Sequence, residues 1–349
     1  MSLRRVGANL LLLVIATCLS LGIAEGLSRI VLPLSAGSQI VQITALENGG
    51  RILHALSNEY DKRYVETAQG YRAPAVADPQ IVFIGDSFTY GIGLNDDESF
   101  PYLYCRAVES RCANLGVPNS GTGLQVRRLR RFLEEGWRPQ EVKLFMLVMV
   151  DYLGAGNDLL DNLDSAEQEH DPLDGRMADA GETVKVAYKV AETRRGADSK
   201  PDTNNDARFS LIDVGRGSLR YSNLARVLYY KLGPQIRAVL SPEPERRKLD
   251  RALGITAGHL NELEAMSRQY GFDDRIYLIH PMQDIINGTD ENTTEMMSAA
   301  FERDIVSTRP AFADNVKSYY YNYDGHLNPK GSQAIAAFLV RLDEGRQNR

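Results

Sequence analysis

Two short segments of the sequence carry side chains that could act together in nucleophilic catalysis. In the first, Ser87 follows the apolar run QIVFI within the segment GDSFTYG, where a buried strand would give way to a helix. A serine at the start of a helix is surrounded by backbone N–H groups that can stabilise a developing oxyanion. The alternative is a serine that only caps the helix, which is a common use of this residue.

The second segment, DGHLNP, holds one of the five histidines of the chain. Asp324 stands two residues before His326, and Gly325 allows the chain to turn between them. The carboxylate could then orient the imidazole, which would accept the proton of a serine hydroxyl. The alternative is an Asp-Gly turn in which the histidine is incidental.

Two further loops contain groups that could bind an oxyanion. The loop NLGVPNSG at residues 114–121 consists largely of small residues, so its backbone N–H groups could face a ligand. The segment GAGND at residues 154–158 contains Asn157, whose side-chain amide could donate to an oxyanion, a contact typically worth about 3 kcal/mol. Each loop alone is only a turn signal, and their common place after predicted strands gives them weight.

These segments follow apolar runs that alternate with helical patterns. Strands are predicted at 80–84, 113–117, 142–150, 275–280 and 316–322, and helices at 100–108, 125–135, 219–232, 246–271 and 332–342. This alternation predicts an α/β domain with a mostly parallel sheet, whose sites form beyond the carboxyl ends of the strands. His280, at the end of the fourth predicted strand, is expected to be a packing residue.

Taken in order, the segments GDSFTYG, NLGVPNSGTG, GND and DGHLNPKG resemble the four sequence blocks of the SGNH/GDSL hydrolases. The resemblance covers roughly residues 78–342 and is poor over 161–250. It implies a three-layer α/β/α fold with a flavodoxin-like parallel sheet, and ester hydrolysis or acyl transfer as the activity.

Carried over block by block, the resemblance implies a role for five residues. Ser87 would be the nucleophile, His326 the base and Asp324 the residue that orients His326. The oxyanion donors would be the N–H of Ser87, the N–H of Gly121 and the side chain of Asn157. The family needs neither a metal ion nor an organic cofactor.

The sequence departs from the family pattern at three places. The oxyanion residue of the second block falls on Asn119 or on Gly121, depending on how the loop is aligned. The usual spacing is Asp-x-x-His, but Tyr323 occupies that first position, and the shorter spacing of Asp324 is found in some membrane-anchored and polysaccharide-modifying branches. The third block lacks its leading glycine, because Ala155 stands there.

The N-terminal segment 6–24 is free of charge and close to the roughly 20 residues that cross a bilayer. Arg4 and Arg5 precede it, a bias that keeps the N-terminus in the cytoplasm and places the rest of the chain outside. We expect a retained transmembrane signal-anchor and an extracytoplasmic catalytic domain, periplasmic or extracellular. The alternative is a cleaved signal peptide with Gly22 and Ala24 at the small-residue positions.

The expected organisation has four parts: a cytoplasmic tip at 1–5, the transmembrane helix at 6–24, a stem with helical pieces at 25–78, and the hydrolase domain at 79–342. An insertion at about 161–250 interrupts this domain. Its first part, 161–206, is rich in Asp, Glu, Ala and Gly and is poor in large apolar residues.

Charge and cysteine content narrow the possible functions. The formal net charge of -6 argues against a general nucleic-acid binder, which needs a basic surface. The three cysteines form neither a CxxC motif nor a Cys/His cluster, which argues against a structural zinc site. Cys105 and Cys112 are seven residues apart and could be a disulfide or two buried thiols.

The expected function is a serine esterase that hydrolyses O-acyl esters, with O-acetyl groups on an envelope or exported glycan as the candidate substrate. One alternative is an O-acyltransferase that uses the same residues with a sugar hydroxyl in place of water. The other is a non-catalytic binding or scaffold protein of exopolysaccharide assembly that keeps the fold.

Overall fold

The computed structural model describes residues 16–28, 39–57, 59–72, 78–118, 120–148, 158–159, 162, 224, 245–313, 315–322 and 324–347. The chain divides into two compact units, residues 1–36 with 198–242, and residues 37–197 with 243–349. In the first unit, residues 16–28 form a helix, and the N–H of Leu224 donates to Glu25 at 2.8 Å. Within the described part of the chain, no helix has both the length and the apolar character needed to cross a membrane. Of the predicted anchor at 6–24, residues 6–15 lie outside the described ranges.

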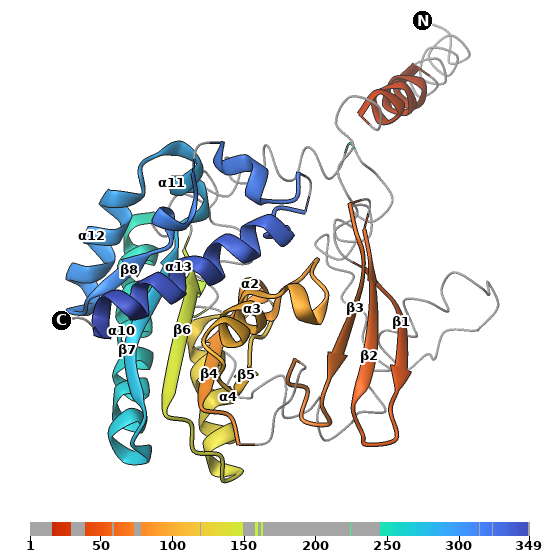
Figure 1. Ribbon diagram of the computed structural model, residues 1–349. Helices are drawn as coiled ribbons and strands as arrows, with labels where there is room; N and C mark the ends of the chain where they lie inside the picture. The colour runs from red at the N-terminus through yellow and green to blue at the C-terminus, as the bar shows by residue number, and fades with distance from the viewer. Residues whose placement is uncertain are drawn as a thin grey trace, which may run out of the picture. The chain divides into compact units, whose positions relative to one another are not determined.

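The second unit contains a five-stranded parallel sheet (Figure 1). Its strands are β4 (Ile81–Gly85), β5 (Cys112–Asn114), β6 (Glu141–Leu147), β7 (Asp273–His280) and β8 (Ile305–Ser307). They lie in the order β5-β4-β6-β7-β8, and every neighbouring pair is parallel. This is the flavodoxin-like strand order, in which β5 is added on one side of β4 and the later strands are added on the other side. The prediction of an α/β domain around a parallel sheet is therefore confirmed.

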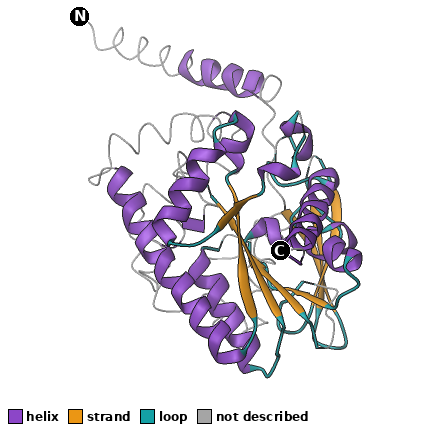
Figure 2. Ribbon diagram, turned by 60° about the vertical axis from the view of Figure 1, so that its left-hand side comes forward, coloured by secondary structure: helices purple, strands orange, loops and turns teal. Residues whose placement is uncertain are grey.

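Helices cover both faces of this sheet (Figure 2). One hydrophobic cluster joins the sheet to α4 (Thr122–Glu134), α10 (Glu245–Tyr270) and α12 (Asp290–Phe301). The other joins it to α3 (Phe100–Ala107), α11 (Met282–Asn287) and α13 (Pro329–Gln347). Strand β4 is buried along its whole length, as expected for a strand covered on both faces.

A second, antiparallel sheet belongs to the same unit and consists of β1 (Gln39–Ala45), β2 (Arg51–Leu56) and β3 (Asp61–Glu66). Arg72 forms single β-bridges to Glu66 of β3 and to Asn114 of β5. The expectation of helical pieces in a stem is therefore wrong for residues 39–66. Residues 51–56 and 61–66 are instead the two paired strands of a hairpin.

The predicted strand at 316–322 is also wrong. Residues Val316–Tyr319 form the 3-10 helix η3, and Tyr320 makes only an isolated bridge to Leu327. The fifth strand is β8, which precedes this segment. The tyrosines raised the apparent strand propensity, but that propensity reflects packing more than an intrinsic backbone preference. Here Tyr319 and Tyr320 are buried although neither belongs to a strand of the sheet.

The long insertion lies almost entirely outside the described residues. Of 161–250, the structure describes Asn162, Leu224 and the first turns of α10. The predicted helix at 219–232 is described only at Leu224, so it stays a prediction.

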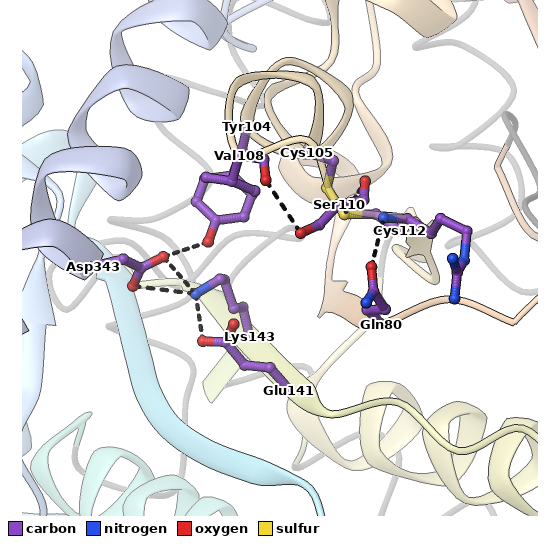
Figure 3. The surroundings of a disulfide bond; sticks show 10 residues. Gln80, Tyr104, Cys105, Val108, Ser110, Cys112, Glu141, Lys143 and Asp343 are labelled. Carbon is purple, nitrogen blue, oxygen red and sulfur yellow. Dashed lines mark hydrogen bonds and ion pairs between the residues drawn. A yellow bond between two sulfur atoms is a disulfide. The ribbon is translucent and has the colours of Figure 1, made fainter. Parts of the chain in front are cut away.

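A disulfide joins the end of α3 to the start of β5 (Figure 3). The Cα atoms of Cys105 and Cys112 are 6.1 Å apart. Close by, the fully buried ammonium of Lys143 on β6 pairs with Glu141 at 2.5 Å and with Asp343 of α13 at 3.0 Å. Tyr104 of α3 donates its hydroxyl to the same Asp343. These contacts tie α3 and the end of α13 to the sheet.

Candidate active site

The nucleophile turn is the point where β4 ends and the short helix α2 (Ser87–Tyr90) begins. A side chain at Gly85 would stand 2.1 Å from Thr89 Oγ1 and 2.6 Å from the Phe145 carbonyl, so the close approach of the helix requires glycine. Asp86 caps α2 by accepting the N–H of Phe88 at 2.9 Å. The helix cap is therefore Asp86, and the hydroxyl of Ser87 is available for another role.

The histidine loop folds back on itself between η3 and α13. The N–H of Tyr321 donates to the His326 carbonyl at 2.8 Å, and the N–H of Asn328 donates to the Tyr319 carbonyl at 3.0 Å. Gly325 has a φ of 81°, a left-handed conformation that favours glycine. This is the turn between Asp324 and His326 that the sequence predicts.

The structure brings the three predicted catalytic side chains together. Ser87 Oγ lies 2.9 Å from Nε2 of His326, although 239 positions separate the two residues. Nδ1 of the same imidazole contacts Oδ1 of Asp324. The side chain of Asp324 is 3% exposed and that of His326 is 22% exposed, so the carboxylate is enclosed while the imidazole reaches solvent.

Electrostatics keep the Asp324 carboxylate ionised. Its burial alone would raise its pKa, but hydrogen bonds from His326 and Tyr60 hold that pKa below the usual value. An ionised carboxylate fixes the imidazole tautomer with a proton on Nδ1 and leaves Nε2 free to accept the serine proton.

A second carboxylate stands on the other side of Ser87. Burial raises the pKa of Asp86 to about 6, and the nearby imidazole of His326 acts against this rise. Asp86 Oδ2 lies 3.3 Å from Ser87 Oγ. The Ser87 hydroxyl has one proton and can donate it to only one partner at a time. Donation to His326, over the shorter contact of 2.9 Å, is the arrangement that activates the oxygen as a nucleophile.

His280 lies at the carboxyl end of β7 and is fully buried. Its Nδ1 contacts Thr308 Oγ1 at 2.7 Å, and its Nε2 contacts the Tyr320 hydroxyl at 3.0 Å. Burial lowers the pKa of His280 to about 3, so the ring is neutral. The Phe88 ring lies 5.1 Å from the His280 ring and 5.1 Å from the His326 ring, between centroids. His280 thus packs beneath the site, as expected from the sequence.

The predicted oxyanion donors are only partly described. Asn157 and the alternative second-block residue Asn119 lie outside the described residues. Gly121 caps α4, and a side chain there would stand 2.5 Å from Asn162 Oδ1 and 3.0 Å from the Asp158 carbonyl. The second and third blocks are therefore in close contact, and the donor roles of Ser87, Gly121 and Asn157 stay predictions.

The third block is also anchored to the sheet. The carboxylate of Asp158 accepts the N–H of Leu147, at the end of β6, at 3.3 Å and the side-chain amide of Gln125 at 3.0 Å. These contacts fix Asp158, which directly follows Asn157 in the sequence. Among the described residues, no group of three or more His, Cys, Asp or Glu side chains could hold a metal ion.

Two residues of the site were missed by the sequence reasoning. Tyr60 donates its hydroxyl to Asp324 Oδ2 at 2.8 Å, and Glu59 accepts the backbone N–H groups of Asn322 and Asp324. Both residues lie on the turn between β2 and β3. A single sequence gives no signal for a contact across 264 positions, although the alternating residues on each side of SNEY could have indicated the hairpin.

No family model and no curated protein matches this sequence. Among solved structures, the chain is similar to a protein described as lipolytic and of the G-D-S-L family from Desulfitobacterium hafniense, at 11% identity over 75% of this chain and 97% of that chain, with a TM-score of 0.36. A member of the lipolytic protein G-D-S-L family from Veillonella parvula has 10% identity over 75% of this chain and 96% of its own, with a TM-score of 0.35.

A third similar structure is a carbohydrate esterase whose active site has divergent catalytic and non-catalytic binding functions. It has 10% identity over 89% of this chain and 86% of its own, with a TM-score of 0.34. Two of the three proteins are thus named for the family whose sequence blocks this chain resembles. With TM-scores below 0.5, these likenesses decide nothing about activity, which depends on the contacts of Ser87, His326 and Asp324.

Proposed function

We propose that this protein is a serine esterase of the SGNH/GDSL type that cleaves O-acyl esters through an acyl-enzyme. The observation that carries the proposal is the continuous chain of contacts from Ser87 Oγ through the His326 ring to the Asp324 carboxylate. A serine that only capped a helix would not need this contact, and the cap of α2 is already supplied by Asp86. The four sequence blocks that resemble this family agree with it.

In the proposed reaction, Ser87 Oγ attacks the ester carbonyl while His326 Nε2 takes its proton. Asp324 stabilises the imidazolium that forms. The oxyanion of the tetrahedral intermediate would be held by the N–H groups of Ser87 and Gly121 and by the side chain of Asn157. The imidazolium then protonates the leaving alkoxide, and a water molecule activated by the same imidazole releases the acid and frees Ser87.

We propose glycan O-acyl groups, with O-acetyl first, as the substrate class, and an extracytoplasmic location at the membrane. The location is supported by the apolar segment at 6–24 behind Arg4 and Arg5 and by the Cys105–Cys112 disulfide, which is stable in an oxidising compartment. Protease added to spheroplasts that express the full chain should cleave the domain, because the proposed location is outside the intact inner membrane. Protection of that domain until the spheroplasts are lysed would contradict the location.

Turnover of p-nitrophenyl acetate by site variants tests the activity. Ser87→Ala and His326→Ala should each lower kcat by at least about 1,000-fold, because nucleophile and base act as one unit. Ser110→Ala and His259→Gln are matched controls outside the site and should keep wild-type rates. Near-normal turnover by Ser87→Ala would refute the proposal.

Product analysis separates hydrolysis from acyl transfer. We expect free acid from an O-acetylated glycan or a p-nitrophenyl ester whether or not a glycan acceptor is present. Label from the acyl donor that appears on the glycan in place of free acid would favour the O-acyltransferase. Absence of both products, with a folded protein that binds glycan, would favour the non-catalytic scaffold.

A further inference from the structure

The Asp324 carboxylate has a partner on each of its two oxygens. Oδ1 faces the His326 ring, while Oδ2 accepts the hydroxyl of Tyr60 at 2.8 Å. Tyr60 lies on the turn between β2 and β3 of the antiparallel sheet, outside the segment 79–342 that holds the four family-like blocks. Its side chain is enclosed, with the residue 7% exposed, so the contact is shielded from bulk water.

The neighbouring residue holds the backbone of the same loop. The two carboxylate oxygens of Glu59 accept the N–H of Asn322 at 2.6 Å and the N–H of Asp324 at 2.9 Å. A carboxylate that accepts two N–H groups fixes their relative orientation, and hydrogen bonds to a charged acceptor are the stronger kind. Glu59 therefore fixes the backbone from which the Asp324 side chain extends.

The turn that carries both residues is itself well fixed. The N–H of Ser57 donates to the Tyr60 carbonyl at 2.9 Å. The Ser57 hydroxyl accepts the N–H of Glu59 at 3.0 Å and that of Tyr60 at 3.2 Å. The turn closes β2 onto β3, which pair from Arg51 opposite Glu66 to Leu56 opposite Asp61. Ser57, Glu59 and Tyr60 are thus held by contacts within their own hairpin, apart from those to the histidine loop.

Tyr60 also packs on that loop through its ring. The rings of Tyr60 and Tyr321 are 4.8 Å apart between centroids. A phenylalanine at position 60 would keep this ring contact and remove only the hydroxyl, which makes the role of the hydrogen bond separable from that of packing.

We propose that Tyr60 is a positioning residue of the catalytic histidine–aspartate pair, and that the β2–β3 turn with Glu59 is a built-in part of the active site. The proposal rests on the esterase function proposed above. Tyr60 touches no reacting atom: it orients Asp324 and takes up part of its negative charge, and through Asp324 it tunes the imidazole.

The sign of its effect on pH dependence follows from electrostatics. The Tyr60 hydroxyl helps to hold the pKa of Asp324 below its usual value. Without this donor, more of the carboxylate charge faces His326, so the imidazolium is more stable and the base is lost at a higher pH. The acid limb of kcat/KM should therefore move upward in Tyr60→Phe.

Other titratable groups face this pair and must stay the same for the comparison to be valid. They are Asp86 beside Ser87, Glu59 on the turn, and Tyr321 in the histidine loop. Burial raises the pKa of Tyr321 beyond the working range, so it stays neutral. Tyr60→Phe alters none of these side chains.

The experiment measures kcat, KM and the pH profile of the full chain with p-nitrophenyl acetate. For Tyr60→Phe we expect kcat to fall about 10-fold with KM nearly unchanged, the size expected for a lost hydrogen bond to a charged group. The acid limb should move up by several tenths of a pH unit. For Glu59→Gln we expect kcat to fall as well, because an amide presents only one acceptor oxygen to the N–H groups of Asn322 and Asp324.

The matched control is Asp61→Asn. Asp61 lies on the same hairpin, but its side chain is 68% exposed and contacts His54 across the strands, not the histidine loop. It should keep the wild-type kcat and pH profile. A kcat and acid limb of Tyr60→Phe that match those of Asp61→Asn would overturn the proposal.

A second probe does not depend on the stability of a variant. Site-specific incorporation of 3-fluorotyrosine at position 60 keeps the ring and the hydroxyl but makes that hydroxyl a stronger donor. The acid limb should then move to lower pH, opposite to Tyr60→Phe, and movement in the same direction would overturn the proposal. Failure of the esterase function itself is distinguishable, because wild type would then show no turnover, or Ser87→Ala would keep wild-type turnover, whatever Tyr60→Phe does.

Discussion

Gly93 is wedged against the ring of Tyr321: a β-carbon on Gly93 would stand 2.7 Å from Cε2 of that ring. The Tyr321 hydroxyl in turn donates to the Gly93 carbonyl at 2.7 Å, and the Gly93 N–H donates to the Tyr64 hydroxyl at 2.8 Å. Gly93 follows the nucleophile helix, Tyr321 precedes the catalytic histidine, and Tyr64 lies on β3. The three parts of the site therefore meet at one glycine.

Gly93→Ala should lower both stability and kcat although it replaces none of the catalytic side chains. The new methyl group would push Tyr321 and Tyr60, and the φ of 80° adds strain. Gly136→Ala is the matched control, because its φ is 100° but nothing lies within 4 Å of the added carbon. The free energy of unfolding in urea should fall by more than about 1 kcal/mol beyond the loss in Gly136→Ala. The kcat should also fall further than in Gly136→Ala. Equal losses in the two variants would show that the close packing at Gly93 does not matter.

The buried cation Arg72 should be essential for the loop after the nucleophile helix. Its guanidinium pairs with Asp96 at 2.6 Å and donates to the carbonyls of Leu94 at 2.8 Å and Tyr90 at 3.0 Å. Arg72→Met should cost about 3–5 kcal/mol because it leaves these acceptors buried and unpaired. Arg72→Lys should not restore the loss, since an ammonium cannot reach three acceptors in this planar arrangement.

The control for Arg72 is Arg111→Met, which removes a pair with Asp78 in which both side chains are more than half exposed. Such a pair contributes less than about 1 kcal/mol. Chemical unfolding of the three variants would decide the matter, and an Arg72→Met protein as stable as Arg111→Met would contradict this account.

The raised pKa of Asp86 implies a specific pH dependence of the free energy of unfolding. Its pKa in the folded state, about 6, lies above the usual aspartate value of 3.8, so the folded chain binds this proton more tightly than the unfolded chain does. The resulting stabilisation is complete below pH 3.8 and is lost as the pH rises through about 6. Wild type should therefore gain up to about 3 kcal/mol relative to Asp86→Asn between pH 7 and pH 4.

Asparagine at position 86 can still cap α2, so the comparison isolates the charge. Asp324 works in the opposite direction, since its lowered pKa costs stability as the pH falls, but it is present in both proteins and cancels. Free energies of unfolding measured in urea at several pH values test this difference. Parallel curves for the two proteins would exclude a raised pKa at Asp86.

The disulfide should stabilise the fold modestly, because it closes a short loop. Cys105 and Cys112 are seven positions apart, and a loop of this size corresponds to about 2 kcal/mol in the chain-entropy description. The double variant Cys105→Ser/Cys112→Ser should lose about this amount in urea unfolding. Reduced wild type should unfold like the double variant, and a reductant should leave the double variant unaffected. If reduction leaves wild-type stability unchanged, the two cysteines are not paired in solution.

The parallel sheet could be predicted because its strands are buried on both faces. Runs such as QIVFI and VKLFMLVMV are apolar apart from Gln80 and Lys143, and amphipathic segments separate them, so β4 and β6 were located within a few residues. The serine and histidine of the site could also be predicted, since they follow the first strand and a turn at Gly325. The strand-end rule accounts for Ser87. His326 was predicted from the Asp-Gly-His turn and the family resemblance, because the strand expected before it is the 3-10 helix η3.

The antiparallel sheet and its role in the site could not be predicted. Strands β1–β3 carry His54, Lys62 and Arg63 among their apolar residues, so their pattern is weak, and the contact of Tyr60 with Asp324 spans 264 positions. For the tyrosine-rich segment at 316–322, the sequence predicted a strand that the structure does not contain. Two of its tyrosine rings are buried by tertiary packing on a 3-10 helix and the residue after it. Strand β8 has only three residues, too few to give a clear pattern in the sequence.

The central claim, that Ser87 is a nucleophile activated by His326, is tested most directly by covalent labelling. The full chain is incubated with a fluorophosphonate probe, digested, and mapped by peptide mass spectrometry. We predict a single modified residue, Ser87, with labelling abolished in Ser87→Ala and slowed by at least about 100-fold in His326→Ala. An unlabelled wild-type protein, or equal labelling of wild type and Ser87→Ala, would contradict the account.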